Sequence, residues 1–261
     1  MTRRRWIADE FSRDRAALTG AHAAHLARTL RARVGQQFDV ACGDEVRRAT
    51  VSSVADDRVE FALAETIAAG RVAPITLLLA IFRFDRMEWA IEKCTELDVT
   101  WIVPVIARRT EKHLATAAAR RVERWRRIAR EASEQARRVS PAQIADPMKL
   151  KAALAQPDDP NISAAIPTEE LGPGGEVRTS GEKTLRIVLA EAEREVLLND
   201  VLRLHPDVES LSLAIGPEGG WTSEELQSFA SSHWIAASLG QTILRAETAA
   251  IAALAIARAE I

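Results

Sequence analysis

The sequence lacks any run of about 18 apolar residues, the length that a membrane-spanning helix requires. It has only two cysteines, Cys42 and Cys94, which lie far apart without the spacing of metal ligands. The basic first residues are followed by Asp9 and Glu10 instead of an apolar segment, so no signal peptide is predicted. We therefore expect a cytoplasmic protein with no membrane segment and no metal, whose cysteines are reduced and structural.

Several sequence signatures of catalysis are missing as well. No Gly-rich loop ends in Gly-Lys-Ser/Thr, and no Gly-x-Gly-x-x-Gly follows the first predicted strand, which argues against a P-loop or a standard dinucleotide site. No Gly-x-Ser-x-Gly turn of a hydrolase is present, and the five histidines lack zinc-site spacing.

The charge is balanced overall but unevenly distributed along the chain. The formal net charge is only −2, yet arginines gather in residues 108–138 and in the N-terminal third, whereas acids prevail after residue 157. A basic half joined to an acidic half favours a polyanion partner. A solvated arginine-rich helix face explains the same charge run, so both interpretations stay open.

The length of 261 residues predicts about two domains, and 47% hydrophobic residues suffice for globular cores. The first 70 residues contain short strand patterns separated by turn residues, which indicates a small β-barrel domain. The expected elements are one helix over Ala21–Arg33 and strands over Gln37–Ala41, Arg48–Ser53 and Arg58–Ala62.

From residue 71 onward strands alternate with helices, which predicts a parallel α/β sheet. The expected strands are Pro74–Ile81, Val99–Ile106, Thr184–Ala190, Glu209–Ile215 and His233–Leu239. The expected helices are one that Asp85 and Glu88 cap, then Ala115–Arg138, Met148–Ala155, Leu197–Leu204, Ser223–Ser231 and Glu247–Arg258. Residues 157–183 are rich in Pro, Gly and polar residues and predict a long surface loop.

The most informative stretch is residues 211–225, which predicts a buried strand, a Gly-Pro-Glu-Gly-Gly turn over 216–220 and a helix start. Thr222 and Glu225 have the spacing of a capping box. Ligands of open α/β sheets bind at the carboxyl ends of strands, and glycines let the backbone approach a ligand closely. An ordinary strand-to-helix turn explains the glycines equally well.

Two further turns follow apolar strands, at residues 190–193 and 239–248. Because the strands are expected to be parallel, all three turns should gather at one edge of the sheet. A ligand held there mainly by main-chain groups would suit a flat heterocycle with a small polar part.

Residues 215–225 and 239–249 resemble the paired signatures of the 16S ribosomal RNA uridine-N3 methyltransferases, a branch of the knotted SPOUT methyltransferases. Matches extend along nearly the whole chain, through Arg3-Arg4-Arg5-Trp6, residues 85–97 and residues 131–141. The resemblance implies a PUA-like β-barrel RNA-binding domain over 1–70. It also implies a SPOUT α/β domain with a deep trefoil knot over 71–261, which no periodicity would predict because knots are nearly absent from folds.

The same resemblance implies S-adenosylmethionine as methyl donor, a homodimer, and a uridine of 16S rRNA in the 30S ribosomal subunit as substrate. By matching positions, the cofactor-binding residues are Leu189, Ala190, Glu191, Ile215, Gly216, Pro217, Glu218, Gly219, Gly220, Leu239, Gly240, Ile243, Leu244 and Arg245. The expected RNA-binding residues are Arg3, Arg4, Arg5, Arg31, Arg83, Arg108 and Arg138.

The implied reaction requires that uridine N3 lose its imide proton before it attacks the methyl group. Arg138 and Arg245 are the candidates to stabilise the developing anion, and Glu218 or Glu247 could accept the proton. Each carboxylate could instead be a helix-N-terminal charge that only favours the helix dipole. Arg245 could instead hold its own loop through an internal salt bridge.

Some positions depart from the family pattern. Asp98 stands where glycine is usual, which could alter a helix end, Arg83 stands near the place of a common lysine, and residues 190–193 are more acidic than usual. Two other functions stay open at this point, namely a knotted tRNA methyltransferase and a non-catalytic RNA-binding factor of ribosome assembly.

Overall fold

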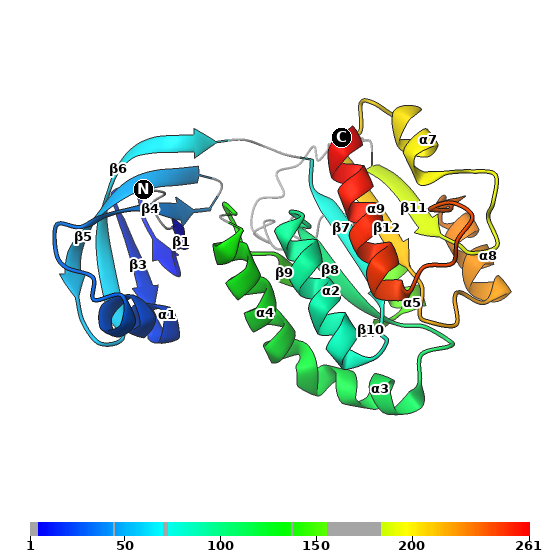
Figure 1. The fold of residues 1–261 in the computed structure, drawn as a ribbon, viewed down its shortest axis with the longest axis horizontal. Coiled ribbons are helices and arrows are strands. Elements are labelled where there is room, and N and C mark those ends of the chain that lie inside the picture. The colour runs from blue at the N-terminus through cyan, green and yellow to red at the C-terminus, as the bar shows by residue number, and fades with distance from the viewer. Residues whose placement is uncertain (1–4, 44, 70–72, 137, 156–183) are drawn as a thin grey trace, which may run out of the picture. The chain divides into compact units, whose positions relative to one another are not determined.

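The computed structural model describes residues 5–43, 45–69, 73–136, 138–155 and 184–261 (Figure 1). The chain forms two compact units, residues 1–72 with 130–141, and residues 73–129 with 142–261. Residues 130–141 are grouped with the first unit although they follow part of the second unit along the chain. Arg3, Arg4 and the predicted loop 157–183 lie outside the described residues.

The first unit is a curled six-stranded sheet with the strand order β1-β4-β5-β6-β3-β2. All neighbouring strands are antiparallel except β1 and β4, which are parallel. The strands are β1 (Arg5–Ile7), β2 (Glu10–Phe11), β3 (Arg15–Thr19), β4 (Gln37–Cys42), β5 (Glu45–Val54) and β6 (Arg58–Ala69). The three strands predicted here are present and longer than expected, whereas β1, β2 and β3 were not predicted.

The predicted helix over Ala21–Arg33 is shorter and changes type along its length. It consists of α1 (Gly20–Ala24) and a π-helical turn, η1 (His25–Thr29), and the chain then turns at Arg31, whose φ is +51°. A left-handed residue cannot continue a right-handed helix, so the element ends before Arg33.

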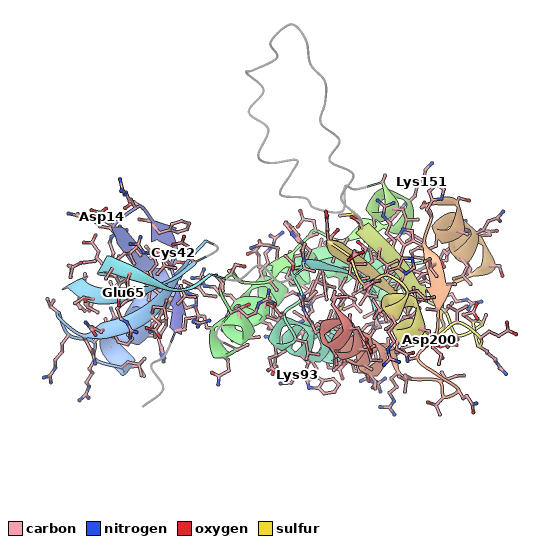
Figure 2. The ribbon with its side chains drawn as sticks, turned by 90° about the horizontal axis from the view of Figure 1, so that it is seen from above. Asp14, Cys42, Glu65, Lys93, Lys151 and Asp200 are labelled. Atoms are coloured by element: carbon pink, nitrogen blue, oxygen red, sulfur yellow. The ribbon has the colours of Figure 1, made fainter. Side chains whose placement is uncertain are left out.

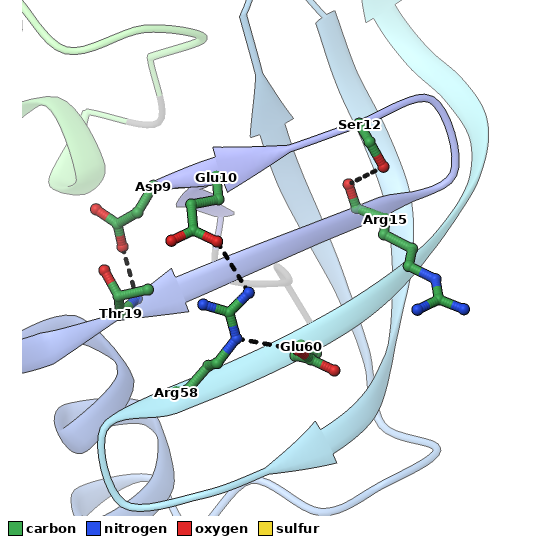
Figure 3. Close-up of polar contacts among 7 residues, drawn as sticks. All are labelled: Asp9, Glu10, Ser12, Arg15, Thr19, Arg58 and Glu60. Carbon is green, nitrogen blue, oxygen red and sulfur yellow. Dashed lines mark hydrogen bonds and ion pairs between the residues drawn. The ribbon is translucent and has the colours of Figure 1, made fainter.

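Charged side chains join the β2, β3 and β6 edge of this unit (Figure 3). Arg58 donates to Glu10 and to Glu60, each at 2.9 Å. Asp9 accepts the backbone N–H of Thr19 at 2.8 Å, which fixes the end of β3. The interior beneath is apolar, with fully buried Trp6, Leu18, Leu26 and Phe61 among its members.

The second unit is built on a seven-stranded sheet in which all paired strands are parallel, as predicted. The order is β10-β8-β7-β12-β11-β13, with β9 paired to β8. The strands are β7 (Ile75–Ala80), β8 (Trp101–Ile106), β9 (Gln143–Ile144), β10 (Met148–Lys149), β11 (Thr184–Leu189), β12 (Ser210–Ile215) and β13 (Ile235–Ala237).

Helices cover both faces of this sheet. Figure 2 shows Lys93 of α2 and Asp200 of α7 on the face that also carries α9, and Lys151 of α5 on the opposite face, where α8 lies. The helices after residue 72 are α2 (Phe84–Glu96), α3 (Lys112–Ala117), the 3-10 turn η2 (Ala118–Arg121), α4 (Val122–Gln135), α5 (Leu150–Leu154), α7 (Leu198–Arg203), α8 (Ser223–Ser231) and α9 (Ala246–Glu260). The residues of α4 from Arg130 onward are grouped with the first unit.

The central strand β7 is buried on both faces, as its continuous apolar sequence predicted. Ile75, Leu77 and Leu79 pack into the core beneath α2 and α9. Leu78 and Ala80 face the second core, beneath α5 and α8. Among the described residues, no helix has the length and apolar character needed to cross a membrane.

Three helices predicted after residue 71 have wrong boundaries. The capping residue of α2 is not Asp85, because the helix already begins at Phe84 and Arg83 occupies the N-cap position. The long helix over Ala115–Arg138 begins earlier, at Lys112, passes through the 3-10 turn and ends at Gln135. Within Met148–Ala155 the first two residues form β10, because Met148 pairs with Val105 at the sheet edge.

Helix α2 keeps a regular end although Asp98 replaces the usual glycine. Asp98 has a φ of +66°, the left-handed conformation that closes many helices. Its N–H donates to the Thr95 carbonyl at 3.0 Å, and the Val99 N–H donates to the Cys94 carbonyl at 3.1 Å. These two bonds form a Schellman motif, so the departure from the family pattern does not alter the helix end.

Arg258 of α9 binds this helix end. Its guanidinium donates to the Asp98 carbonyl and, at 2.7 Å, to the Ala73 carbonyl, and it lies 3.5 Å from the Asp98 carboxylate. Burial lowers the pKa of Arg258. The contact connects the last turn of α9 to the start of β7 and the end of α2.

We expect the variant Asp98→Ala to be less stable than Asp98→Gly by roughly 0.5–1 kcal/mol, since only alanine brings a Cβ into the left-handed conformation. Both variants lose the carboxylate next to Arg258, so their difference isolates the backbone effect. Urea denaturation measures both free energies of unfolding. Equal stabilities would contradict the assigned backbone conformation.

Candidate functional site

The carboxyl ends of β11, β12 and β13 surround a cavity of about 750 Å³. The three predicted turns line it together, joined by Ala246 and Ala249 of α9 and by Arg86 of α2. Every predicted cofactor-binding residue except Gly219 lines this cavity. Sequence reasoning had not assigned Arg86, Arg194, Trp221, Ser238 or Gln241, which line it too.

Part of the cavity lining is apolar, and it comes from the ends of β11 and β12 and from the turn after β13. Leu189, Ile215, Leu239 and Leu244 contribute aliphatic walls, and Ile243 is 78% exposed next to them. An exposed isoleucine at the mouth of a cavity gives a ligand an apolar surface to cover. The volume lies within the range of roughly 300–1,000 Å³ that is typical of small-molecule sites.

The cavity lining also includes the polar side chain of Ser238. The Ser238 hydroxyl is buried, lines the cavity and has no hydrogen-bond partner among the described residues. Its backbone is fixed, because its N–H donates to the Val196 carbonyl at 2.9 Å and its carbonyl accepts the Leu198 N–H at 3.0 Å. Buried hydroxyls are normally bonded, so the Ser238 hydroxyl is a candidate ligand contact.

The turn over 216–220 is packed so tightly that it needs its glycines. A Cβ at Gly216 would lie 3.2 Å from the indole nitrogen of Trp221, and Gly220 has a φ of +69°. Trp221 in turn packs edge-on against Phe229 at 5.0 Å between ring centroids. The aromatic packing beneath the turn therefore fixes the backbone that lines the cavity.

Glu225 fixes the same turn from the other side. The predicted capping box is confirmed, since Thr222 accepts the Glu225 N–H and Glu225 accepts the Thr222 N–H at 2.9 Å. The second oxygen of the buried Glu225 carboxylate accepts the Arg108 N–H at 2.8 Å. One carboxylate thus joins the start of α8 to the turn that follows β8.

Arg109 makes a second connection between these two turns. Its guanidinium donates to the Gly219 carbonyl. A Cβ at Gly219 would lie 3.3 Å from Arg109 Cδ. Gly219, which the sequence assigned to the cofactor, therefore faces Arg109, which explains why it is absent from the cavity lining.

Arg86 engages both glutamates that the sequence proposed as proton acceptors. Its Nη1 lies 3.0 Å from Glu218 Oε1 and its Nε lies 3.6 Å from Glu247 Oε1. Glu247 is buried, and its other oxygen has no hydrogen-bond partner among the described residues. Arg86 thereby joins α2, the 216–220 turn and the first turn of α9.

The two candidate arginines for anion stabilisation lie in different units. Arg245 is exposed, lines the cavity at the N-cap of α9, and makes no ion pair with any described residue. The internal salt bridge considered for it is therefore not found in the described structure. Arg138 is buried within the 130–141 segment of the first unit, where its N–H donates to the Ser133 carbonyl at 2.9 Å.

The expected RNA-binding arginines differ in their surroundings. Arg5 is half-buried on β1, and Arg31 is exposed after η1. Arg83 pairs with Asp85 at 3.3 Å, and the exposed Arg108 side chain pairs with Glu224 at 2.8 Å.

Acidic side chains neutralise much of the arginine-rich segment. Arg121 and Arg124 lie 3.7 and 2.7 Å from Glu88, and Arg126 pairs with Glu123 at 2.6 Å and with Asp146 at 2.9 Å. These ion pairs favour the solvated helix face over a continuous polyanion surface in residues 120–126.

The cysteines are both free and buried, as predicted. Burial raises the pKa of the Cys94 thiol to about 12 and that of Cys42 to about 11, so neither is a nucleophile at neutral pH. Across the described ranges, no group of three or more His, Cys, Asp or Glu side chains could hold a metal ion.

The fold and the cavity define an α/β protein with a small-molecule site at the carboxyl edge of a parallel sheet. Residues 70–258 match the RNA methyltransferase domain family. A ribosomal RNA small subunit methyltransferase E of Synechocystis is 30% identical over 241 residues, which cover 91% of this chain and 71% of that protein. The protein of the same name from Bacillus subtilis is 27% identical, over 91% of this chain and 87% of its own length.

The solved structures include a ribosomal RNA small subunit methyltransferase E from Neisseria gonorrhoeae bound to S-adenosyl methionine. It superimposes with a TM-score of 0.75 at 26% identity and covers 97% of this chain and 96% of its own. The chain therefore belongs to the RNA methyltransferase family and, within it, to the ribosomal RNA small subunit methyltransferases E.

We expect Glu225→Ala to lower the free energy of unfolding by about 2–3 kcal/mol, because two backbone N–H groups lose their acceptor and α8 loses its capping box. Glu224→Ala is the matched control. Its ion pair with Arg108 is solvent-exposed, so its loss should cost less than about 1 kcal/mol. Urea denaturation compares the two variants, and equal losses would contradict the role given to Glu225.

Proposed function

We propose that this protein transfers a methyl group from S-adenosylmethionine to N3 of a uridine in 16S rRNA of the small ribosomal subunit. The observation that carries the proposal is that the turns after β11, β12 and β13 together line one cavity. Membership of the RNA methyltransferase family supports the reaction class. The base and the atom rest on the sequence resemblance of residues 215–225 and 239–249.

The residues of the cavity fit S-adenosylmethionine. Gly240 has a φ of +118° with open space where a Cβ would be, which suits close approach of a ligand to the backbone. The aliphatic wall that includes Leu239 and Leu244 suits a flat adenine, and the Ser238 hydroxyl offers a polar contact. When bound, the cofactor supplies an electrophilic methyl group on a sulfonium centre.

The protein must stabilise a uridine anion whose charge spreads onto two carbonyl oxygens. Arg245 is suited to this task, because its guanidinium lies at the cavity without an ion-pair partner among the described residues. A fixed cation at the place where negative charge develops lowers the barrier without reorganisation during the reaction. Arg138 is proposed for the same role, on the strength of the sequence resemblance.

The two glutamates contribute differently in this proposal. Glu218 is exposed and forms the shorter contact with Arg86, so we assign it to holding the turn. Glu247 is buried at the start of α9 with one oxygen unpartnered within the described structure, so it is the better candidate to accept the N3 proton.

The proposal extends to the rest of the molecule. It includes a PUA-like RNA-binding domain in residues 1–70, a trefoil knot in the methyltransferase domain over 71–261, a homodimer, a 30S substrate and a cytoplasmic location. The curled sheet of the first unit and the parallel sheet of the second support the domain assignment. The exposed Arg31 supports an RNA contact in the first domain.

Nucleoside mass spectrometry tests the proposed reaction directly. In a strain that lacks this gene, 3-methyluridine should be absent from 16S rRNA and should return when the gene is restored. Measurement of tRNA from the same cells tests the alternative substrate. Unchanged 3-methyluridine in 16S rRNA, or a loss confined to tRNA, would contradict the proposed substrate.

Arg245→Ala should lower the rate of 30S methylation by about 10²–10³-fold, because one fixed donor to the developing anion is lost. Arg203→Ala is the control, since Arg203 pairs with Glu260 at 2.9 Å and does not line the cavity. Arg138→Ala should also reduce the rate, with urea denaturation to verify its folding. Normal rates in both the Arg245 and Arg138 variants would contradict the arginine role.

A further inference from the structure

The three carboxylates that line the cavity have different surroundings. Glu193 accepts the N–H groups of Glu195 at 2.9 Å and Val196 at 3.1 Å, which lowers its pKa. Glu218 is paired with Arg86. Glu191 lines the cavity without a hydrogen bond or ion pair to any described residue.

The cations that line the cavity differ in the same way. Arg86 is engaged by two glutamates. Arg194 and Arg245 are exposed and make no ion pair within the described ranges. Arg194 lies three residues after Glu191 in the same turn, so one short segment places an unpaired anion and an unpaired cation at the cavity.

Glu191 reaches toward the neighbouring turn. Its carboxylate lies 3.8 Å from the position that a Cβ would take at Gly220, where the φ of +69° favours glycine. The carboxylate therefore lies between the turns after β11 and β12. Ile243 and Leu244, which supply apolar surface, come from the turn after β13 instead.

We propose that Glu191 and Arg194 recognise the zwitterionic methionyl tail of the methyl donor, with Glu191 binding its ammonium group and Arg194 its carboxylate. This inference rests on the proposed function and adds the residues that orient the cofactor. A guanidinium fork matches a carboxylate in two parallel hydrogen bonds, and charge-assisted bonds are about twice as strong as neutral ones.

Arg245 is the other unpaired cation, and its surroundings assign it elsewhere. Its neighbours Leu244 and Ala246 are apolar and line the cavity, so a flat heterocycle fits next to them better than a charged tail. With the tail at the 190–196 turn, Arg245 stays available for the RNA substrate. The two unpaired arginines then serve two different anions.

Isothermal titration calorimetry of the full chain with four adenosine ligands tests the assignment. S-adenosylmethionine and S-adenosylhomocysteine carry both charged groups of the tail. Decarboxylated S-adenosylmethionine keeps only the ammonium group, and 5′-deoxy-5′-methylthioadenosine has neither. We expect wild-type affinity to fall as these groups are removed.

Glu191→Gln should weaken the three ligands that carry an ammonium group by about tenfold or more, and leave 5′-deoxy-5′-methylthioadenosine unchanged. Arg194→Gln should weaken only the two ligands that carry the carboxylate, by a similar factor. Glu195→Gln is the matched charge control, because Glu195 lies in the same turn but does not line the cavity. It should bind all four ligands like the wild type.

Two results would overturn the inference while the proposed function stands. In the first, wild type binds S-adenosylmethionine and both variants retain full affinity. In the second, both variants weaken all four ligands equally, which would indicate a distorted cavity instead of recognition of the tail. If wild type bound none of the four ligands, both the inference and the proposed function would fail.

Discussion

The arrangement of the cavity depends on one buried carboxylate, that of Glu225. A buried carboxylate is costly unless hydrogen bonds satisfy its oxygens. Here the backbone N–H groups of Thr222 and Arg108 do so from two different turns. The turn after β8 is thereby fixed against the start of α8. Once it is fixed, Arg109 lies where its guanidinium reaches the Gly219 carbonyl, and the 216–220 turn takes the shape that lines the cavity.

The sequence predicted those parts of the fold that depend on local pattern. The apolar run of β7 and the capping box of α8 both appear, because burial on two faces and a local hydrogen-bond pair leave direct signals. The failures have tertiary causes. Helix α2 already starts at Phe84, after the buried residues Ile81 and Phe82 that follow β7, so Asp85 lies inside the helix and does not cap it. Met148 sits in a strand because it pairs with Val105 of β8 at the sheet edge. Such partners are far away in sequence.

In the site, the turns with unusual backbone conformation could be predicted from the sequence, whereas the side-chain contacts between distant residues could not. The glycines of the 216–220 turn and Gly240 indicate an unusual backbone conformation. All of these glycines except Gly219 line the cavity. Arg86 binds Glu218, which lies 132 residues later in the chain, and Arg109 binds Gly219, which lies 110 residues later. Nothing in the local sequence around either arginine indicates that it has such a distant partner. The family match over residues 85–97 contained Arg86 but gave no reason to single it out.

Pairing sorts the charged residues of this site into two kinds. Some charged groups bind other protein groups and so hold the turns in place. Examples are Arg86 with Glu218, and Glu193 with two backbone N–H groups. Other charged groups have no partner in the described structure and are therefore available to bind a ligand. These are Glu191, Arg194 and Arg245. A ligand that bears charges of both signs and a polyanionic substrate would need both kinds at once. The fixed turns preorganise the unpaired charges, so that binding need not also order the loops.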